Sequence, residues 1–402
     1  MTTTPATAVA EYIEARRDEF IEDLRTLVHA ETPSQDKPLL DAGLEVVRRV
    51  VVNLLGEPSA ETRHDGGTYG DVLDLRWEGR DDDGAELTGD AAGDPVLVVC
   101  HYDTVWPAGT IQTWPLTVDG DRLTGPGVLD MKFGIVQTAW AVKALRELGV
   151  GHPPVRMLLT GDEEIGSVAG RPHIEAAAQE SALTLVTEPS AAGNPKDRRK
   201  GMVFADLRVT GRQAHAGLEP EKGASAVHAL AALVGDVVDL ASPEHGTTVT
   251  VGTFHGGTGR NVVAGSAEAL VDVRVTEPAE QDRVVAGLEG LRLPAPHADD
   301  ERLSLDVDVD ANRPPMNPTP ETEVVLDRVK EIGRQLGREL EPTAVGGASD
   351  ANFVSALGLP VVDGLGAVGE GPHAVHEHIL ISGIAPQTAL LAGILNDRTR
   401  DR

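Results

Sequence analysis

Hydrophobic and polar positions follow two different patterns along the chain. In the first half, continuous apolar runs such as "PVLVVC" (95–100), "VRMLLT" (155–160) and "ALTLVT" (182–187) alternate with segments of helical spacing. Continuous runs rich in valine and leucine are typical of strands buried on both faces of a sheet. Together with helical segments at 132–149 and 170–180, they predict an α/β fold whose largely parallel sheet is flanked by helices.

Further helices are expected where apolar residues recur every three or four positions. These segments span approximately 7–30, 37–55, 320–337 and 383–396. A short strand, "LPVVDGL", is expected between the last two helices.

The pattern changes between residues 202 and 313. There, "MVFADLRVTG" and "ALVDVRVT" alternate apolar with polar positions, which is typical of antiparallel strands with one exposed face. Helices are expected at 223–240 and 280–292, and the proline-rich "NRPPMNPTP" then returns the chain to its first pattern. The sequence therefore predicts one domain from residues 1–201 and 314–402, with 202–313 as an inserted α+β domain.

Composition excludes several classes of partner and site. The 402 residues include 64 acidic and 35 basic side chains, and the net charge of −29 argues against nucleic acid or an anionic membrane as a partner. The single cysteine, Cys100, excludes an internal disulfide and a cysteine-based zinc site, and its place in an apolar run predicts a core position. Because no leader pattern and no apolar run of ~18 residues is found, we expect a cytoplasmic protein.

Polar residues follow four of the predicted strands. His101 comes directly after "PVLVVC", Glu163 and Glu164 follow "VRMLLT", Glu188 follows "ALTLVT", and His373 lies downstream of "LPVVDGL". In an open α/β sheet, ligands bind beyond the carboxyl ends of the strands. We therefore expect these side chains to lie at the same edge of the sheet.

Asp130 is expected to join them, because the glycine-rich "GPGVLDMKFG" places it just before a helix. Two histidines and three carboxylates without a cysteine suit two zinc-class divalent ions bridged by one carboxylate. Taken alone, His101 could be a core histidine, Glu188 a helix-capping acid and Asp130 a turn residue. All of these explanations would have to hold together at one edge of the sheet, so a metal centre is the favoured hypothesis.

These residues lie in segments that resemble the M20 family of metallopeptidases and amidohydrolases, most closely its glutamate carboxypeptidase branch. The segments run in order through "HYDTVWPAG", "GPGVLDMKFG", "GDEEIGS", "TEPS", "GRQAHAG", "GRNVVAGSAEALVDVR", "GGASDANF" and "GPHAVHEH". The resemblance implies a di-zinc catalytic domain with an inserted lid or dimerisation domain. The implied reaction is zinc-dependent hydrolysis of an amide or peptide bond in a small molecule with a free carboxylate, releasing a C-terminal amino acid.

The resemblance also implies a ligand set for two zinc ions. One ion would be held by His101, Asp130 and Glu188, and the other by Asp130, Glu164 and His373. Co²⁺ or Mn²⁺ could replace zinc, since nitrogen and oxygen ligands discriminate weakly among these ions. Spacing to Glu377 favours His373 as the ligand, but His376 and His378 remain alternatives.

Further roles follow from the same resemblance. Asp103 matches an acid that orients the ring of His101, and Glu163 matches the general base that takes a proton from water. Asp162 is left as a structural acid. In the insert, His215 matches a lid histidine that reaches the active site of the partner subunit and polarises the scissile carbonyl, which implies a homodimer formed through the lid domain.

Asn261 and Arg274 match lid groups that bind the polar end of the substrate, and Arg313 is a second candidate anchor for a carboxylate, which arginine can bind in bidentate fashion. The segment "KDRRKGMVF" lacks the short lysine pattern of a strict glutamate-releasing enzyme, which leaves the substrate open. An N-acyl-amino-acid deacylase or a dipeptidase with the same metals is the alternative. A more remote one is a metal-free binding protein on a hydrolase fold, although no expected ligand is missing.

Overall fold

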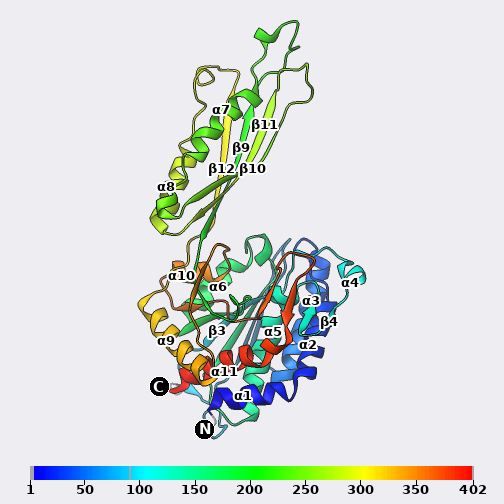
Figure 1. The fold of residues 1–402 in the computed structure, drawn as a ribbon, viewed down its shortest axis with the longest axis vertical. Helices are drawn as coiled ribbons and strands as arrows, with labels where there is room; N and C mark the ends of the chain where they lie inside the picture. The colour runs from blue at the N-terminus through cyan, green and yellow to red at the C-terminus, as the bar shows by residue number, and fades with distance from the viewer. Residues whose placement is uncertain (1–3, 90–91, 401–402) are drawn as a thin grey trace. The chain divides into compact units, whose positions relative to one another are not determined.

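The computed structural model describes residues 4–89 and 92–400, which form two compact units (Figure 1). The larger unit contains the chain up to Arg198, Asn317–Ala344 and the residues from Ser349 onward, whereas the insert unit contains Arg199–Met316 and Val345–Ala348. The division lies within a few residues of the change in sequence pattern, but no pattern indicated that Val345–Ala348 returns to the insert unit. Among the described residues, no helix is both long and apolar enough to cross a membrane.

The larger unit is built on a six-stranded sheet with the order β1-β2-β6-β3-β7-β14. Its strands are β1 (Ala60–His64), β2 (Val72–Trp77), β3 (Val96–His101), β6 (Val155–Thr160), β7 (Leu183–Val186) and β14 (Val361–Val362). Strands β6, β3, β7 and β14 are parallel, whereas β2 is antiparallel to both β1 and β6. The α/β class with a mainly parallel sheet is therefore confirmed, and the antiparallel pair at one edge is an addition that the sequence pattern did not show.

Helices cover both faces of this sheet. The helices of the larger unit are α1 (Pro5–Glu14), α2 (Arg17–His29), α3 (Lys37–Leu55), α4 (Thr110–Thr113), α5 (Phe133–Glu147), α6 (Gly170–Gln179), α9 (Pro320–Gln335), α10 (Ala351–Ala356) and α11 (Ile384–Arg400). In the central strand β3, Val96, Val98 and Cys100 belong to the main core cluster, which includes α5 residues. Leu97 and Val99 point the other way and are equally buried, and α6 contacts the strand as well.

The predicted helix 7–30 is wrong as a single element, because the structure has two helices, α1 and α2. At the break, Arg16 has φ −121° and ψ 18°, and its guanidinium lies 3.9 Å from the ring centroid of Tyr12. The buried residues on either side, such as Ile13 and Phe20, still face the core. Because both helices bury one apolar face, the spacing of apolar residues alone did not reveal the break.

Two smaller sheets accompany the six-stranded sheet. A four-stranded sheet has the order β15-β16-β5-β4, and a two-stranded ribbon pairs β8 with β13. Their bounds are β4 (Thr117–Asp119), β5 (Arg122–Thr124), β8 (Lys196–Arg199), β13 (Thr343–Val345), β15 (Gly369–Glu370) and β16 (His378–Leu380). Strand β16 follows the loop that carries His373, and it pairs with β5, which precedes the loop of Asp130.

The insert unit is a four-stranded antiparallel sheet with two helices. Its elements are β9 (Gly201–Thr210), α7 (Ala226–Val238), β10 (Thr248–Gly256), β11 (Ser266–Val275), α8 (Pro278–Glu289) and β12 (Ser304–Arg313), with the strand order β10-β11-β9-β12. In β9, Val203 and Leu207 are buried against the helices, whereas Phe204 and Arg208 are exposed. This alternation is the one that the sequence predicted.

Cys100 occupies the core position expected for it. Its side chain is fully buried, and its Sγ lies 3.2 Å from Oγ1 of Thr187. Burial raises the pKa of this thiol to about 11.

A second buried titratable group, His152, lies between α5 and β6. The ring is fully buried, with Nδ1 2.8 Å from the carbonyl of Pro153 and Nε2 accepting from Nε of Arg146 at 3.3 Å. These contacts suit the neutral ring with its proton on Nδ1. Burial, together with the positive charge of the neighbouring Arg146, lowers the pKa of His152 to about 4.

We therefore expect His152 to make folding sensitive to mild acid. Since an unfolded histidine titrates near ~6.5, the unfolded chain binds the extra proton first, and stability is lost as the pH falls from ~6.5 towards 4, by at most about 3 kcal/mol. His152→Gln should reduce the fall in Tm between pH 7 and pH 5, measured by differential scanning calorimetry. The exposed His29→Gln serves as a control that should leave this fall unchanged, and an unchanged fall in His152→Gln would contradict the assignment.

Candidate metal centre and active site

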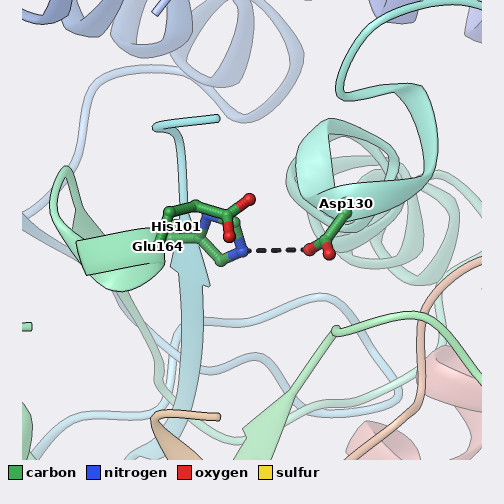
Figure 2. A group of neighbouring side chains, drawn as sticks. All are labelled: His101, Asp130 and Glu164. Atoms are coloured by element: carbon green, nitrogen blue, oxygen red, sulfur yellow. Dashed lines mark hydrogen bonds and ion pairs between the residues drawn. The ribbon is translucent and has the colours of Figure 1, made fainter. Parts of the chain in front are cut away.

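The ends of three adjacent parallel strands bring acidic and imidazole side chains together (Figure 2). His101 is the last residue of β3, and Glu188 follows β7 by two residues. After β6, the short helical turn η3 (Glu163–Ile165) carries Glu163 and Glu164. Asp130 arrives from η2 (Val128–Lys132), the turn before α5, where its own backbone is extended at φ −116° and ψ 97°.

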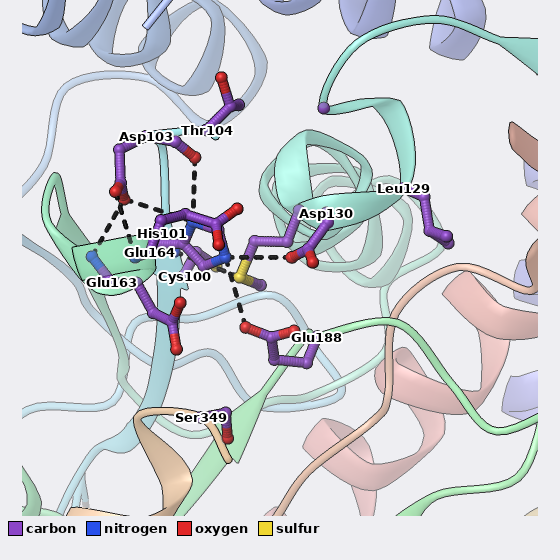
Figure 3. A network of polar contacts seen from close by, with 12 residues as sticks. Cys100, His101, Asp103, Thr104, Leu129, Asp130, Glu163, Glu164, Glu188 and Ser349 are labelled. Carbon is purple, nitrogen blue, oxygen red and sulfur yellow. Dashed lines mark hydrogen bonds and ion pairs between the residues drawn. The ribbon is translucent and has the colours of Figure 1, made fainter. Parts of the chain in front are cut away.

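The ring of His101 is held from both sides. Its Nδ1 lies 3.0 Å from the carbonyl oxygen of Asp103 and 3.4 Å from Oδ1 of the same residue. Its Nε2 lies 3.2 Å from Oδ1 of Asp130 and 3.3 Å from Oε1 of Glu188 (Figure 3). A proton on Nδ1 thus leaves Nε2 facing two carboxylates, which is the tautomer required of a metal ligand.

Asp130 lies between two histidines. Its Oδ1 faces His101, and its Oδ2 lies 3.5 Å from Nε2 of His373. The same nitrogen of His373 is 2.9 Å from Oε2 of Glu164. Each oxygen of Asp130 therefore faces a different histidine, and each histidine has a further carboxylate of its own.

His373 belongs to the loop between β15 and β16, and its side chain is 53% exposed. Its backbone has φ +63°, a conformation that L residues rarely adopt. The other two histidines of this loop lie differently: His376 is exposed, whereas His378 is buried with Nδ1 2.9 Å from the carbonyl of His376. The contacts thus favour His373 among the three.

Asp103 connects His101 to the two adjacent glutamates. Its Oδ1 accepts from the backbone N–H of Glu163 at 3.2 Å, and its Oδ2 accepts from that of Glu164 at 3.3 Å. Oγ of Ser34 donates to Oδ2 at 2.8 Å. The carboxylate is fully buried, so these donors compensate for the water that it loses.

The three consecutive acids diverge. Glu163 is 8% exposed, and one of its oxygens, one of Glu188 and a ring nitrogen of His101 all lie within 4.8 Å of one another. Figure 3 shows the side chains of Glu163 and Glu164 extending in different directions from η3. Oδ2 of Asp162 instead accepts from the backbone N–H groups of Ala169 and Gly170, at 2.6 and 3.2 Å, which supports its expected structural role.

The cluster has the electrostatics of a cation site. Burial would lower the pKa of His101, but hydrogen bonds to Asp103, Asp130 and Glu188 raise it well above its usual value. Hydrogen bonds to Asp130 and Glu164 raise the pKa of His373 to about 10. Burial raises the pKa of Glu164 to about 7 against the opposing effect of His373. Without a metal ion, protons on the histidines and on Glu164 reduce the repulsion among the carboxylates. A divalent cation that binds there would displace these protons.

One atom supports this interpretation directly. Oε1 of Glu164 is buried and accepts no hydrogen bond from any residue in the described ranges. A buried carboxylate oxygen without a donor is unfavourable unless a cation binds it. The nitrogen and oxygen donor set, without cysteine, suits zinc and related divalent ions.

Glu377 contributes to the geometry of the site, but the sequence analysis assigned it no role there. It is fully buried, and its carboxylate accepts four N–H donors. They are the backbone groups of Gly127 at 3.0 Å, Leu129 at 2.8 Å and Asp130 at 3.2 Å, and the indole of Trp106 at 2.8 Å. The sequence analysis used Glu377 only for its spacing to His373. No local sequence pattern indicates that its carboxylate accepts these four hydrogen bonds.

In the insert unit, His215 and Asn261 lie on adjacent loops. The backbone N–H of Ala216 donates to the carbonyl of Asn261 at 2.9 Å, and both candidate side chains are exposed. Nδ1 of His215 accepts from the backbone N–H groups of Gly217 and Leu218, each at 3.2 Å. The neutral ring must then carry its proton on Nε2, which makes that nitrogen a hydrogen-bond donor.

Arg274 and Arg313 lie at the other end of the insert sheet, where both are in register with Met202 of β9. Arg274 forms a bidentate pair with Asp272, with Nε and Nη2 each donating at 2.8 Å. Arg313 is 5% exposed. The 10-residue strand β11 separates this end from the loops of His215 and Asn261 by roughly 30 Å.

A sequence model of "Peptidase family M20/M25/M40" matches residues 97–397, which include every residue of this cluster. The chain belongs to this family. It is therefore a hydrolytic enzyme, and the family resemblance found in the sequence is confirmed.

The proteins to which this chain is similar are named for different reactions. Carboxypeptidase G2 of Pseudomonas sp. (strain RS-16) is 28% identical over 387 residues, covering 94% of this chain and 88% of that protein. Succinyl-diaminopimelate desuccinylase of Thioalkalivibrio sulfidiphilus is 30% identical over 326 residues, covering 75% and 83% of the two chains. An M20 family metallo-carboxypeptidase of Sulfolobus solfataricus shares the fold, with a TM-score of 0.74, 18% identity and coverage of 94% and 99%.

If Asp103 orients His101, then Asp103→Asn should weaken metal binding. An asparagine would point an N–H₂ group at donors that now face a carboxylate oxygen, so we expect the affinity for Zn²⁺ to fall about 10- to 100-fold. Competition with a chromophoric chelator would measure the change. Ser34→Ala, which removes a single donor, should have a smaller effect, and an unchanged affinity in Asp103→Asn would rule out the orienting role.

Proposed function

We propose that this M20 enzyme is a dinuclear zinc hydrolase that cleaves an amide or peptide bond and releases a C-terminal amino acid from a small molecule with a free carboxylate. The position of Asp130, with one oxygen towards each of two histidines, is the observation that carries the proposal. A carboxylate that bridges two metal ions needs this arrangement.

In the proposed centre, one ion is held by His101, Asp130 and Glu188, and the second by Asp130, Glu164 and His373. Co²⁺ and Mn²⁺ are compatible with the same donors. When bound, such a pair of ions supplies a water of lowered pKa and polarisation of the substrate carbonyl. The free oxygen of Glu164 supports its assignment as a ligand.

Glu163 is the proposed general base. It is buried beside His101 and Glu188 without being needed as a ligand, and its backbone N–H is fixed by Asp103. It takes a proton from the attacking water and returns that proton to the amine of the leaving amino acid. Because the side chains of Glu163 and Glu164 point in different directions, Glu164 can bind the metal while Glu163 faces the substrate.

His215 is the proposed donor to the oxyanion that forms on the scissile carbonyl. Its two backbone partners at Nδ1 leave the Nε2 proton available, which suits this role. Asn261 is expected to act beside it on the polar end of the substrate.

Arg274 is the proposed partner of the substrate carboxylate, with Arg313 as a second anchor. Asp272 already occupies Nε and Nη2 of Arg274, so the substrate would bind at Nη1 and the outer edge of Nη2. Because Arg274 and His215 lie roughly 30 Å apart, one insert unit cannot direct both at one small substrate. We propose that a second copy of the chain supplies His215.

The proposed homodimer would form through the insert unit. Strand β10 is at one edge of the insert sheet and spans nine residues, with Phe254 38% exposed. An edge strand of this length presents backbone donors and acceptors that a second copy can pair.

The alternative substrate is an N-acyl amino acid or a dipeptide, hydrolysed at the same centre. The 30% identity to a desuccinylase favours keeping this alternative, since that relative is named for removing an acyl group. The acyl side of the substrate would distinguish the two activities, whereas the metal centre would serve both.

The proposed base predicts a specific phenotype for Glu163→Gln. The variant should retain two metal ions per chain but lose activity by about 10²- to 10⁴-fold, because the proton transfer is removed while the ligands remain. Mass spectrometry of products from a panel of N-acyl amino acids, dipeptides and pteroyl-glutamate-like compounds would measure turnover. Each panel member should be paired with its carboxamide, and only the free-carboxylate form should react.

The surface variant Glu175→Gln, on α6, is the matched control and should behave as wild type. Retained turnover in Glu163→Gln would rule out this base. Equal turnover of acids and carboxamides would instead contradict the requirement for a free carboxylate.

The proposed sharing of His215 between subunits predicts complementation. Glu163→Gln and His215→Ala should each be inactive alone, but a mixed dimer contains one site with Glu163 from one chain and His215 from the other. Random assembly of equal amounts should restore about a quarter of wild-type activity. Activity of differently tagged, co-expressed chains would measure this, and no recovery in isolated mixed dimers would show that His215 acts within its own chain.

A further inference from the structure

Glu377 connects three loops of the site: its carboxylate accepts hydrogen bonds from two of them, and its own backbone belongs to the third. Trp106 lies in the loop that follows His101 and Asp103, and its indole donates to Oε2 of Glu377 at 2.8 Å. Gly127, Leu129 and Asp130 belong to the loop that carries the bridging aspartate, and each donates a backbone N–H.

The third link runs along the chain and through the backbone. Glu377 follows His373 by four residues, and its backbone N–H donates to the carbonyl of Ala374 at 2.8 Å. Its own carbonyl accepts from Gly125 at 3.4 Å, at the start of the Asp130 loop. The loop of His373 is thereby tied to the loop of Asp130 at two points, the carbonyl and the carboxylate.

The chemistry requires a carboxylate at this position. Four N–H groups converge on two oxygens in a site from which water is excluded, and each group would be unsatisfied without an acceptor. A cation lies in the same region: Lys132 is buried with Nζ 2.8 Å from the carbonyl of Ala30, and Glu377 opposes the loss of its charge. Burial raises the pKa of Glu377 to about 6, whereas the hydrogen bonds from the three backbone N–H groups and from Trp106 lower it.

We propose that Glu377 is a positioning residue that sets the distances among the metal ligands of both subsites at once. It is not one of the proposed metal ligands. By holding the Asp130 backbone against the loops of His101 and His373, it fixes where the shared carboxylate stands between the two histidines. This role rests on the proposed dinuclear function. It adds to the site a residue that is not among the proposed ligands.

The role predicts a loss that is coupled between the two subsites. Glu377→Gln keeps the size of the side chain but directs an N–H₂ group at N–H donors, so the Asp130 loop should relax. We expect the affinity for both Zn²⁺ ions to fall together, by about 10- to 100-fold. His373→Ala, which removes a ligand of one subsite, should weaken one ion far more than the other.

The measurement is a Zn²⁺ titration of the metal-free protein against a chromophoric chelator, supported by the visible absorption of the Co²⁺-loaded protein as a readout of coordination geometry. Trp106→Phe removes one donor to Glu377 and provides a milder variant, which decides the question if Glu377→Gln does not fold. It should weaken both sites in parallel, several-fold, with a shifted Co²⁺ spectrum.

Asp74→Asn is the matched control. Asp74 is also a buried carboxylate of the larger unit, paired with Arg156 through contacts of 2.6 to 3.0 Å, but it lies on β2 away from the ligand loops. Its variant should lower Tm without changing metal affinity. If Glu377→Gln or Trp106→Phe also lowers Tm without changing metal affinity, Glu377 is a purely structural residue and the proposal is overturned. Wild-type protein that binds no metal would overturn the proposed function as well, so the two failures are distinguishable.

Discussion

Burying several carboxylates beside one another is unfavourable, and the candidate site depends on how the fold compensates for it. Asp103, Asp162 and Glu377 are each fully buried, and each accepts at least two backbone N–H groups. Those donors come from turns that begin where strands end, so the sheet supplies the amides as well as the acids. The carboxylates that lack such donors, above all Glu164, are the ones left to histidines and to a cation. Acids that accept backbone N–H groups are therefore structural, whereas acids without such donors are available to bind a metal ion.

Much of this could be predicted from the sequence because it depends on strand order. His101, Glu163, Glu164 and Glu188 follow apolar runs that had to be buried parallel strands, and parallel neighbours end at the same edge of a sheet. Asp130 and His373 rested on weaker patterns, since neither ends a strand of that sheet. A glycine-rich loop before a helix indicated Asp130, and a loop with three histidines downstream of "LPVVDGL" indicated His373. The parts that the sequence did not reveal depend on contacts between distant segments. Glu377 finds its partners some 250 positions away, and the break at Arg16 leaves the apolar spacing unchanged.

The insert unit carries its candidate substrate residues at both ends of one sheet. Its antiparallel strands hold His215 and Asn261 at one end and Arg274 and Arg313 at the other, and a sheet packed on two helices keeps that separation constant. Under the proposed function, each insert would therefore serve two active sites, contributing a hydrogen-bond donor to one and a carboxylate anchor to the other. Binding of substrate at either site would then depend on the same rigid element.

The burial of the single cysteine has a practical consequence for measuring how the insert unit moves during turnover. Cys100 is enclosed between the strands and α5, and its thiol resists ionisation, so maleimide reagents should leave the native chain unmodified. Cysteines introduced on exposed positions can then be labelled selectively without first removing a native one. A pair of spectroscopic probes, one on each unit, would report their separation in solution during turnover on an otherwise unaltered protein.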